Sequence, residues 1–175
     1  MDVEDVIRNR IEVREYAEQA IDPATREAIL DAARLAPSGR NHQHWRFIVV
    51  DDQEDLTRLA EISTTGSWIE DAAFAVVVLT DPEYYYHQLD AGRAITNMQF
   101  LGWNRGVGSC IYTGYDDELM REHLEVPDEY AIPAVVGFGR PPFDIDQIQG
   151  RKNRRSLSDL VYQDRYGRSA SFGER

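Results

Sequence analysis

The sequence predicts an α+β or α/β sandwich built around one mixed sheet. Helix-type and strand-type patterns alternate along the 175 residues, which is the arrangement expected of such a sandwich. The segment FAVVVLT, residues 74–80, is too apolar for a strand with one exposed face, so it implies a sheet covered on both faces. No repeat, low-complexity tract or linker interrupts the pattern, and residues 1–175 are therefore expected to form a single domain.

The first half of the chain predicts three helices and a strand. Val3–Asn9 has the pattern of a first helix. DPATREAILDAARLA follows as a second helix, with Asp22 as its N-cap and Pro23 in its first turn. RFIVVDD reads as a buried strand, and a short helix is expected over 53–62.

The second half predicts a long central helix over 83–105, because apolar residues recur there at helical spacing: Leu89, Ala94, Ile95, Met98, Leu101 and Gly102. GSCIYTG then predicts a strand, DDELMREHLEV a helix capped by Asp116, and AIPAVVGFGRP another strand. The ending RKNRRSLSDLVYQDRYG is basic, amphipathic and irregular.

Composition argues against a secreted, membrane-spanning, disulfide-bonded or metal-binding protein. The acidic start MDVEDVIRNR does not resemble a secretory signal, and no apolar run approaches the roughly 20 residues of a membrane span, so a cytoplasmic location is expected. The single cysteine, Cys110, is expected to be a small buried apolar side chain. No Cys/His pair has metal-ligand spacing, and neither a disulfide nor a metal site is predicted.

The net charge of −12 argues against a general nucleic-acid binder, because such binding depends on cationic neutralisation of phosphates. Of the 19 cationic residues only Lys152 is a lysine. An acidic, lysine-poor surface is typical of a halophilic protein, in which salt screens the repulsion between carboxylates. An ordinary acidic protein from a GC-rich coding sequence is the alternative.

Three polar or basic segments stand out, namely residues 8–14 (RNRIEVR), 36–45 (APSGRNHQHW) and 151–155 (RKNRR). Guanidinium groups favour bidentate contact with phosphate. For either cationic cluster taken alone, pairing with surface carboxylates is the commoner explanation. The connector 36–45 carries more hydrogen-bonding groups than a turn requires.

The order of these motifs resembles the nitroreductase family of FMN-dependent oxidoreductases over essentially the whole chain. The segments that carry the resemblance are RIEVREY near the start, APSGRNHQHWRFIVV, a long Ala-containing helix, GVGSCIYTG and a closing basic segment with RYG. The resemblance implies a nitroreductase-like three-layer α-β-α sandwich with a central mixed, mainly antiparallel sheet. It also implies a homodimer with flavin at the subunit interface.

By this resemblance, Arg10 and Arg14 contact the flavin phosphate, ribityl chain or pyrimidine edge, with Arg8 as a helper. Ile11 offers its backbone there, and Glu12 brings a carboxylate where the family usually has a basic or hydroxylic residue. At the other end of the chain, Lys152 and Arg154, with Arg155, match the family's phosphate-binding basic pair.

The polar connector is implied to reach the flavin of the neighbouring chain through Pro37, Ser38, Gly39, Asn41 and Gln43. His44 stands where the family commonly has proline, and Trp45 is expected to pack in the core. The strand end is implied to lie over the flavin ring through the backbone of Ile111, Tyr112, Thr113 and Gly114.

The implied chemistry is a ping-pong cycle in which NADH or NADPH reduces FMN, which then reduces a nitroaromatic, quinone or related electron-poor acceptor. No side chain is nominated as catalytic. Arg14 has an electrostatic role near the anionic reduced flavin, and His42, His44 and His87 are taken as surface residues. Tyr84, Tyr85 and Tyr86 are expected to be partly buried at the start of the long helix, although they and residues 63–68 could line the pocket.

Two other classes of function stay open. One is a non-catalytic flavin-binding protein, a sensor or carrier. The other is an anion- or nucleotide-binding module without flavin, which the net charge disfavours.

Overall fold

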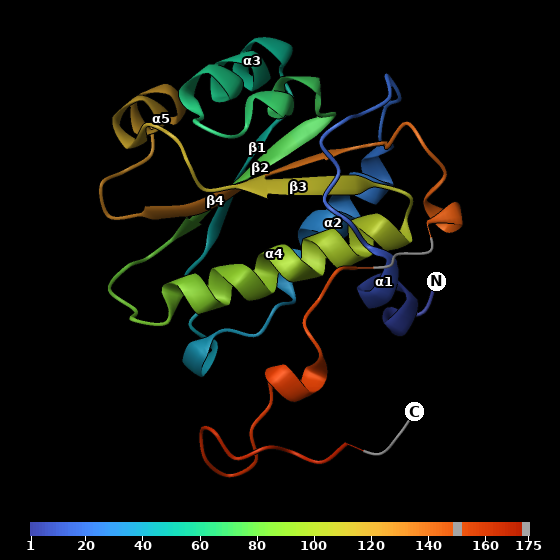
Figure 1. Cartoon of the computed structure of the whole chain (residues 1–175). Helices are drawn as coiled ribbons and strands as arrows, with labels where there is room; N and C mark the ends of the chain where they lie inside the picture. The colour runs from blue at the N-terminus through green and yellow to red at the C-terminus, as the bar shows by residue number, and fades with distance from the viewer. Residues whose placement is uncertain (149–151, 173–175) are drawn as a thin grey trace.

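The computed structural model describes residues 1–148 and 152–172, and Figure 1 shows its arrangement. Its α-helices are α1 (Val3–Asn9), α2 (Pro23–Arg34), α3 (Gln53–Ile62), α4 (His87–Asn104) and α5 (Asp117–Leu124). Its strands are β1 (Arg46–Val50), β2 (Phe74–Thr80), β3 (Gly108–Tyr112) and β4 (Ala131–Gly139). Short 3-10 turns lie at η1 (Gly39–Asn41), η2 (Ser67–Asp71), η3 (Ile145–Gln147) and η4 (Leu157–Asp159).

The four strands form one sheet in the order β1-β2-β4-β3, and neighbouring strands are antiparallel. Every residue of β2 is buried. Phe74, Val76 and Val78 belong to the core shared with α2 and α4, whereas Ala75 and Val77 belong to the core shared with α3 and α5. The alternation of side chains along a strand thus produces three layers, with helices on both faces of the sheet (Figure 1).

The predicted fold class, an α+β three-layer sandwich with a mainly antiparallel sheet and a long central helix, is confirmed. A parallel pairing occurs where Glu12 bridges Ser109 at the outer edge of β3. The predicted N-caps Asp22 and Asp116 each accept a hydrogen bond from the first turn of their helices. Asp52, which was not predicted as a cap, does the same for α3.

Some boundaries and exposures differ from the prediction. The long helix begins at His87, not at residue 83, because residues 81–86 form turns before it. Tyr84 and Tyr86 are half-buried as expected, but Tyr85 is 94 % exposed. Leu89 is 59 % exposed, although its helical spacing grouped it with the apolar residues of the long helix. The two strands that end in glycine-containing segments stop earlier than predicted, at Tyr112 and Gly139.

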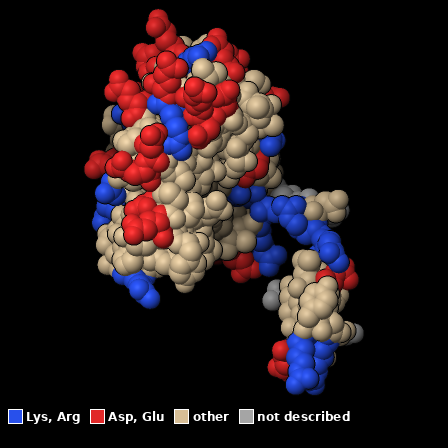
Figure 2. Space-filling view, turned by 90° about the vertical axis from the view of Figure 1, so that its left-hand side faces the viewer, with Lys and Arg blue, Asp and Glu red and all other residues tan. Residues whose placement is uncertain are grey.

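Charge is distributed unevenly over the surface. Figure 2 shows carboxylates gathered at the end of the molecule that carries α3 and α5, while cationic residues follow the C-terminal segment. That segment, residues 152–172, projects away from the three-layer body (Figures 1 and 2). Among the described residues, no helix combines the length and the apolar character needed to cross a bilayer.

The acidic end of the molecule leads to a salt prediction. We expect the melting temperature to rise between 0.1 and about 2 M NaCl, because the Debye length falls from about 10 Å to less than 3 Å and screens carboxylate repulsion. The double variant Glu122→Gln/Glu129→Gln removes two exposed carboxylates from this end, and it should show a smaller rise, measured by differential scanning fluorimetry. A melting temperature independent of salt would contradict a halophilic origin of this surface.

Candidate functional site

The segment 10–14 lies beside the start of β3 in an extended conformation. Val13 N–H donates to the Ser109 carbonyl at 3.0 Å, and Glu12 forms the parallel bridge with the same residue. Side chains alternate in such a segment. Val13 is therefore buried, whereas Arg10, Glu12 and Arg14 share the opposite, polar side.

This polar side brings the predicted N-terminal and C-terminal cations together. Lys152 Nζ donates to the carbonyl of Ile7, and burial lowers the pKa of Lys152, as do the nearby charges of Arg10 and Arg154. Arg10 Nη1 lies 2.6 Å from Glu12 Oε1. Arg10, Glu12, Lys152 and Arg154 thus form one group, which we call the cationic cluster.

Other predicted cations lie outside the cationic cluster. Arg8 is exposed and pairs with Glu4 one turn earlier on α1, at 2.6 Å, which is the surface pairing left open by the sequence. Arg155 Nη2 donates to the carbonyl of Asp159 in its own segment. Arg151 lies outside the described residues.

Arg14 lies further along the same side, near Cys110. Burial raises the pKa of the Cys110 thiol to about 12; Glu12 contributes to the rise and Arg14 opposes it. Cys110 is fully buried, as predicted. Burial also raises the pKa of Tyr16, which donates a hydrogen bond to the Val13 carbonyl at 2.8 Å and holds the extended segment against the body.

The predicted strand end, residues 111–114, continues the outer edge of β3 beyond the bridge to Glu12. Thr113 is exposed, and Tyr112 is buried with a hydroxyl that has no hydrogen-bond partner in the described structure. Thr64 N–H donates to the Gly114 carbonyl at 2.9 Å. The segment 63–68 therefore packs beside the strand end, and a Cβ on Gly114 would lie 2.3 Å from Thr64 Oγ1.

The predicted connector forms a tight loop at the N-terminal end of α4. Ser38 Oγ accepts a hydrogen bond from the Gln43 N–H, and the Gln43 side chain donates to the Asn41 carbonyl. The hydroxyl of Tyr86 lies 2.7 Å from His42 Nδ1. Trp45, which follows the loop, is buried in the core as expected.

This loop has an unusual backbone. Arg40, Asn41 and Gln43 have φ values of 50°, 60° and 48°, in the left-handed region. For residues other than glycine this region costs roughly 1–2 kcal/mol each. The loop therefore needs contacts that hold it, and strained backbone of this kind often occurs at functional sites.

Sequence reasoning missed the group that supplies such contacts. Asp90, in the first turn of α4, is fully buried. Its Oδ2 accepts from Gly39 N–H at 2.9 Å and lies 3.2 Å from His44 Nε2, and its Oδ1 accepts from Arg93 at 3.1 Å. His44 is buried, so its treatment as a surface histidine was wrong. An acidic residue at a core-facing helical position was the available signal.

The structure does not bring all the predicted residues to one place within a single chain. The loop 37–43 contacts the N-terminal end of α4, whereas α1 and the start of β3 lie toward its C-terminal end (Figure 1). The 18 residues of α4 span about 27 Å. The cationic cluster and the loop are therefore two separate groups of predicted residues, and most of that length lies between them.

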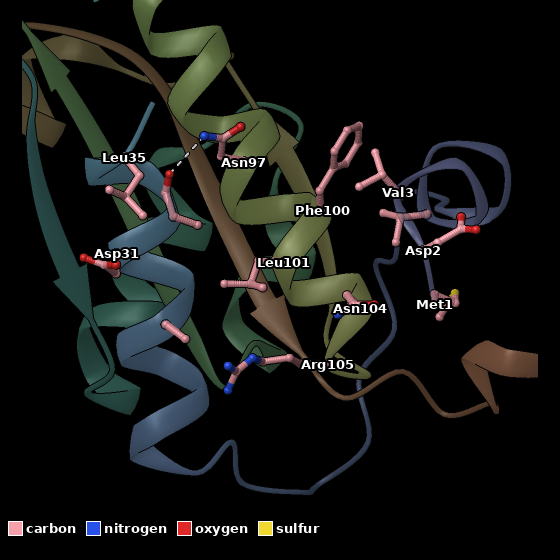
Figure 3. Close-up of a pocket in the computed structure, with 13 residues that line it drawn as sticks. Met1, Asp2, Val3, Asp31, Leu35, Asn97, Phe100, Leu101, Asn104 and Arg105 are labelled. Carbon is pink, nitrogen blue, oxygen red and sulfur yellow. Dashed lines mark hydrogen bonds between the residues drawn. The ribbon is translucent and has the colours of Figure 1, made fainter. Parts of the chain in front are cut away.

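A third feature lies between α1, α2 and α4. It is a cavity of about 550 Å³. Figure 3 shows Val3, Leu35 and Phe100 among the residues that line it. Asn97 donates there to the Ala32 carbonyl at 3.1 Å. None of the predicted cofactor residues lines it. A second hollow, beside Pro37, is lined by exposed residues of α4 that include Leu89 and Gly92. Across the described ranges, no group of three potential metal ligands occurs.

Comparison with known proteins identifies the family. The pattern of the nitroreductase family matches residues 7–87 and 64–140. A protein of Archaeoglobus fulgidus provisionally named NADH dehydrogenase/NAD(P)H nitroreductase is 35 % identical over 170 residues, which cover 92 % of this chain and 97 % of that protein. The chain belongs to the nitroreductase family. An oxidoreductase role follows from this membership.

This chain is also similar to other proteins named as nitroreductases. Bacillus subtilis YodC, provisionally named an NAD(P)H nitroreductase, is 34 % identical, with coverage of 78 % of this chain and 88 % of that protein. The solved structure of an FMN-dependent nitroreductase from Clostridium difficile R20291 is 25 % identical and superposes with a TM-score of 0.84, covering 93 % of this chain and 99 % of that one.

The buried thiol beneath the cationic cluster allows a reactivity prediction. Because only the thiolate is nucleophilic and the pKa of Cys110 is about 12, we expect no reaction with a disulfide reagent in the folded protein at pH 8. The same protein in denaturant should release one equivalent of chromophore. Rapid labelling of the folded protein would show that the packing of segment 10–14 over β3 is incorrect.

Proposed function

We propose that this nitroreductase-family protein is an FMN-dependent oxidoreductase that uses NADH or NADPH to reduce nitroaromatic, quinone or related electron-poor acceptors. The observation that supports it most directly is the cationic cluster beside the outer edge of β3. In a chain of net charge −12, cations from both ends of the sequence meet at one place.

The residues present fit a flavin mononucleotide. A phosphate dianion would offset the mutual repulsion that helps to lower the pKa of Lys152. Arg10 and Arg154 supply planar donors that suit phosphate oxygens. The outer edge of β3 from Ile111 onward, beyond the bridge at Ser109, offers backbone groups to the edge of a flat ring.

When bound, FMN would supply the hydride-transfer chemistry between the reduced nicotinamide and the acceptor. Arg10, Lys152 and Arg154 would hold the phosphate. Arg14 would place positive charge where negative charge gathers on the reduced ring. The N–H groups of residues 111–114 would orient the ring, and no side chain is required as a nucleophile.

The loop 37–43 and the cationic cluster of the same chain lie near opposite ends of α4, which is about 27 Å long. The loop therefore cannot contact the cluster of its own chain. A second copy resolves this separation, and we include a homodimer in the proposal. Apolar side chains that a single chain leaves exposed support it: Leu35, Leu89, Leu157, Leu160, Tyr166 and Phe172. Association of two copies would remove apolar surface of this kind from water, which is favourable.

A first prediction concerns the cofactor. The purified protein should show flavin absorbance, or acquire it with added FMN, and should oxidise NADH or NADPH with a quinone or nitroaromatic acceptor. Absence of flavin binding would refute the proposal. Flavin binding without turnover over an acceptor panel would favour the sensor or carrier.

A second prediction concerns the phosphate contacts. Arg10→Ala/Arg154→Ala should weaken FMN binding by about 100-fold or more, since each charge-assisted hydrogen bond contributes about 1.5–3 kcal/mol. The control Arg26→Ala/Arg58→Ala removes the same charge from exposed ion pairs with Asp51 and Glu61. Fluorescence titration measures both affinities, and equal losses in the two variants would contradict the phosphate assignment.

A third prediction concerns assembly. Light scattering should give about twice the chain mass of 20.1 kDa. Leu89→Glu should shift the mass toward one chain and release FMN, because it places a charge on the exposed face of α4. Leu119→Glu, at an exposed position on α5, is the matched control and should leave both unchanged. A wild-type mass of one chain would refute the dimer.

A further inference from the structure

Asp90 is the buried end of a polar chain that runs from α4 into the loop 37–43. Its carboxylate is 0 % exposed and receives Gly39 N–H, His44 Nε2 and Arg93 Nη1. A buried carboxylate is tolerated only when such donors satisfy it. All three donors here come from the loop, from the residue that follows it, or from the next turn of α4.

His44 and Asp90 each fix the orientation of the other's side chain. A carboxylate only accepts, so His44 Nε2 carries the proton that it shares with Asp90. His44 Nδ1 is buried without a partner, and the ring stacks on Tyr84 with centroids 5.2 Å apart. The ring is thus fixed by packing on its faces and by Asp90 at one edge, and it in turn fixes the carboxylate oxygen that Gly39 uses.

Gly39 connects the Asp90–His44 pair to the backbone of the loop 37–43. A Cβ at this position would lie 2.4 Å from the ring of Tyr86, so the backbone approaches α4 as closely as glycine allows. The next residues, Arg40 and Asn41, are both left-handed. The hydrogen bond from Gly39 to Asp90 therefore anchors the loop immediately before its unfavourable backbone.

We propose that Asp90 is a positioning residue for the flavin reaction, which sets the geometry of loop 37–43 by accepting the Gly39 N–H, with His44 orienting its carboxylate. This inference rests on the proposed function, in which the loop serves the flavin of the neighbouring chain. Asp90 itself lies beneath the loop and acts through Gly39. His44, which follows the loop directly, adds a second hydrogen-bonded contact to α4 through Asp90.

The test compares Asp90→Ala, which leaves Gly39 N–H and His44 without an acceptor, with Asp90→Asn, whose amide oxygen still accepts. Val77→Ala is the control, because it loses buried volume on the opposite face of the sheet. Hydrogen exchange of a peptide over residues 37–45 reports on the loop without any need for flavin. FMN affinity and melting temperature are measured on the same full-length proteins.

We expect Asp90→Ala to accelerate exchange over 37–45 at least tenfold and to weaken FMN binding at least tenfold. Asp90→Asn should stay within about threefold of wild type in both. Val77→Ala should lower the melting temperature while leaving loop exchange and FMN affinity within about twofold. These different results for the variants distinguish a positioning role of Asp90 from a general loss of protein stability.

The proposal is overturned if Asp90→Ala behaves like Val77→Ala, if Asp90→Asn behaves like Asp90→Ala, or if loop exchange rises while FMN affinity is unchanged. A wild-type protein that does not bind FMN would instead refute the proposed function. In that case the exchange measurements still show whether Asp90 anchors the loop.

Discussion

The burial of β2 is the constraint on which the rest of the structure depends. All seven of its residues are buried, so both faces of the sheet must be covered by helices. Val76 and Val77 point to opposite cores, one shared with α4 and one with α3. The three layers follow directly, and the polar groups of the loop 37–43 and of the cationic cluster lie at the edge of the sheet and the ends of its helices.

Covering the sheet with one long helix also determines where those polar groups lie. α4 separates the loop 37–43 at its N-terminal end from the cationic cluster near its C-terminal end. Neither group alone surrounds a flavin. Dimerisation is therefore part of the proposed function, in which a second copy would bring its loop 37–43 to the cationic cluster of the first chain.

The sequence predicted the elements well where periodicity reports burial, as in Val3–Asn9 and residues 74–80. The sequence did not predict the environment of side chains whose contacts come from distant parts of the chain. Tyr85 belongs to an aromatic run, yet only its neighbours pack inward. Asp90 was overlooked because two of its hydrogen-bond donors, His44 and Gly39, lie 46 and 51 residues earlier in the chain. The grouping of Arg10 with Lys152 came from family resemblance, since no local pattern links them.

Glu12 shows how a cationic cluster can contain a carboxylate and still suit an anion. Its Oε1 lies 2.6 Å from Arg10 Nη1, and Arg10 is largely buried. Without Glu12, the guanidinium would be held near Lys152 and Arg154 with no compensating charge. Arg10 has five N–H donors, so a carboxylate at one edge orients the group and leaves further donors for phosphate. Glu12 thus compensates the charge of Arg10 within the cationic cluster.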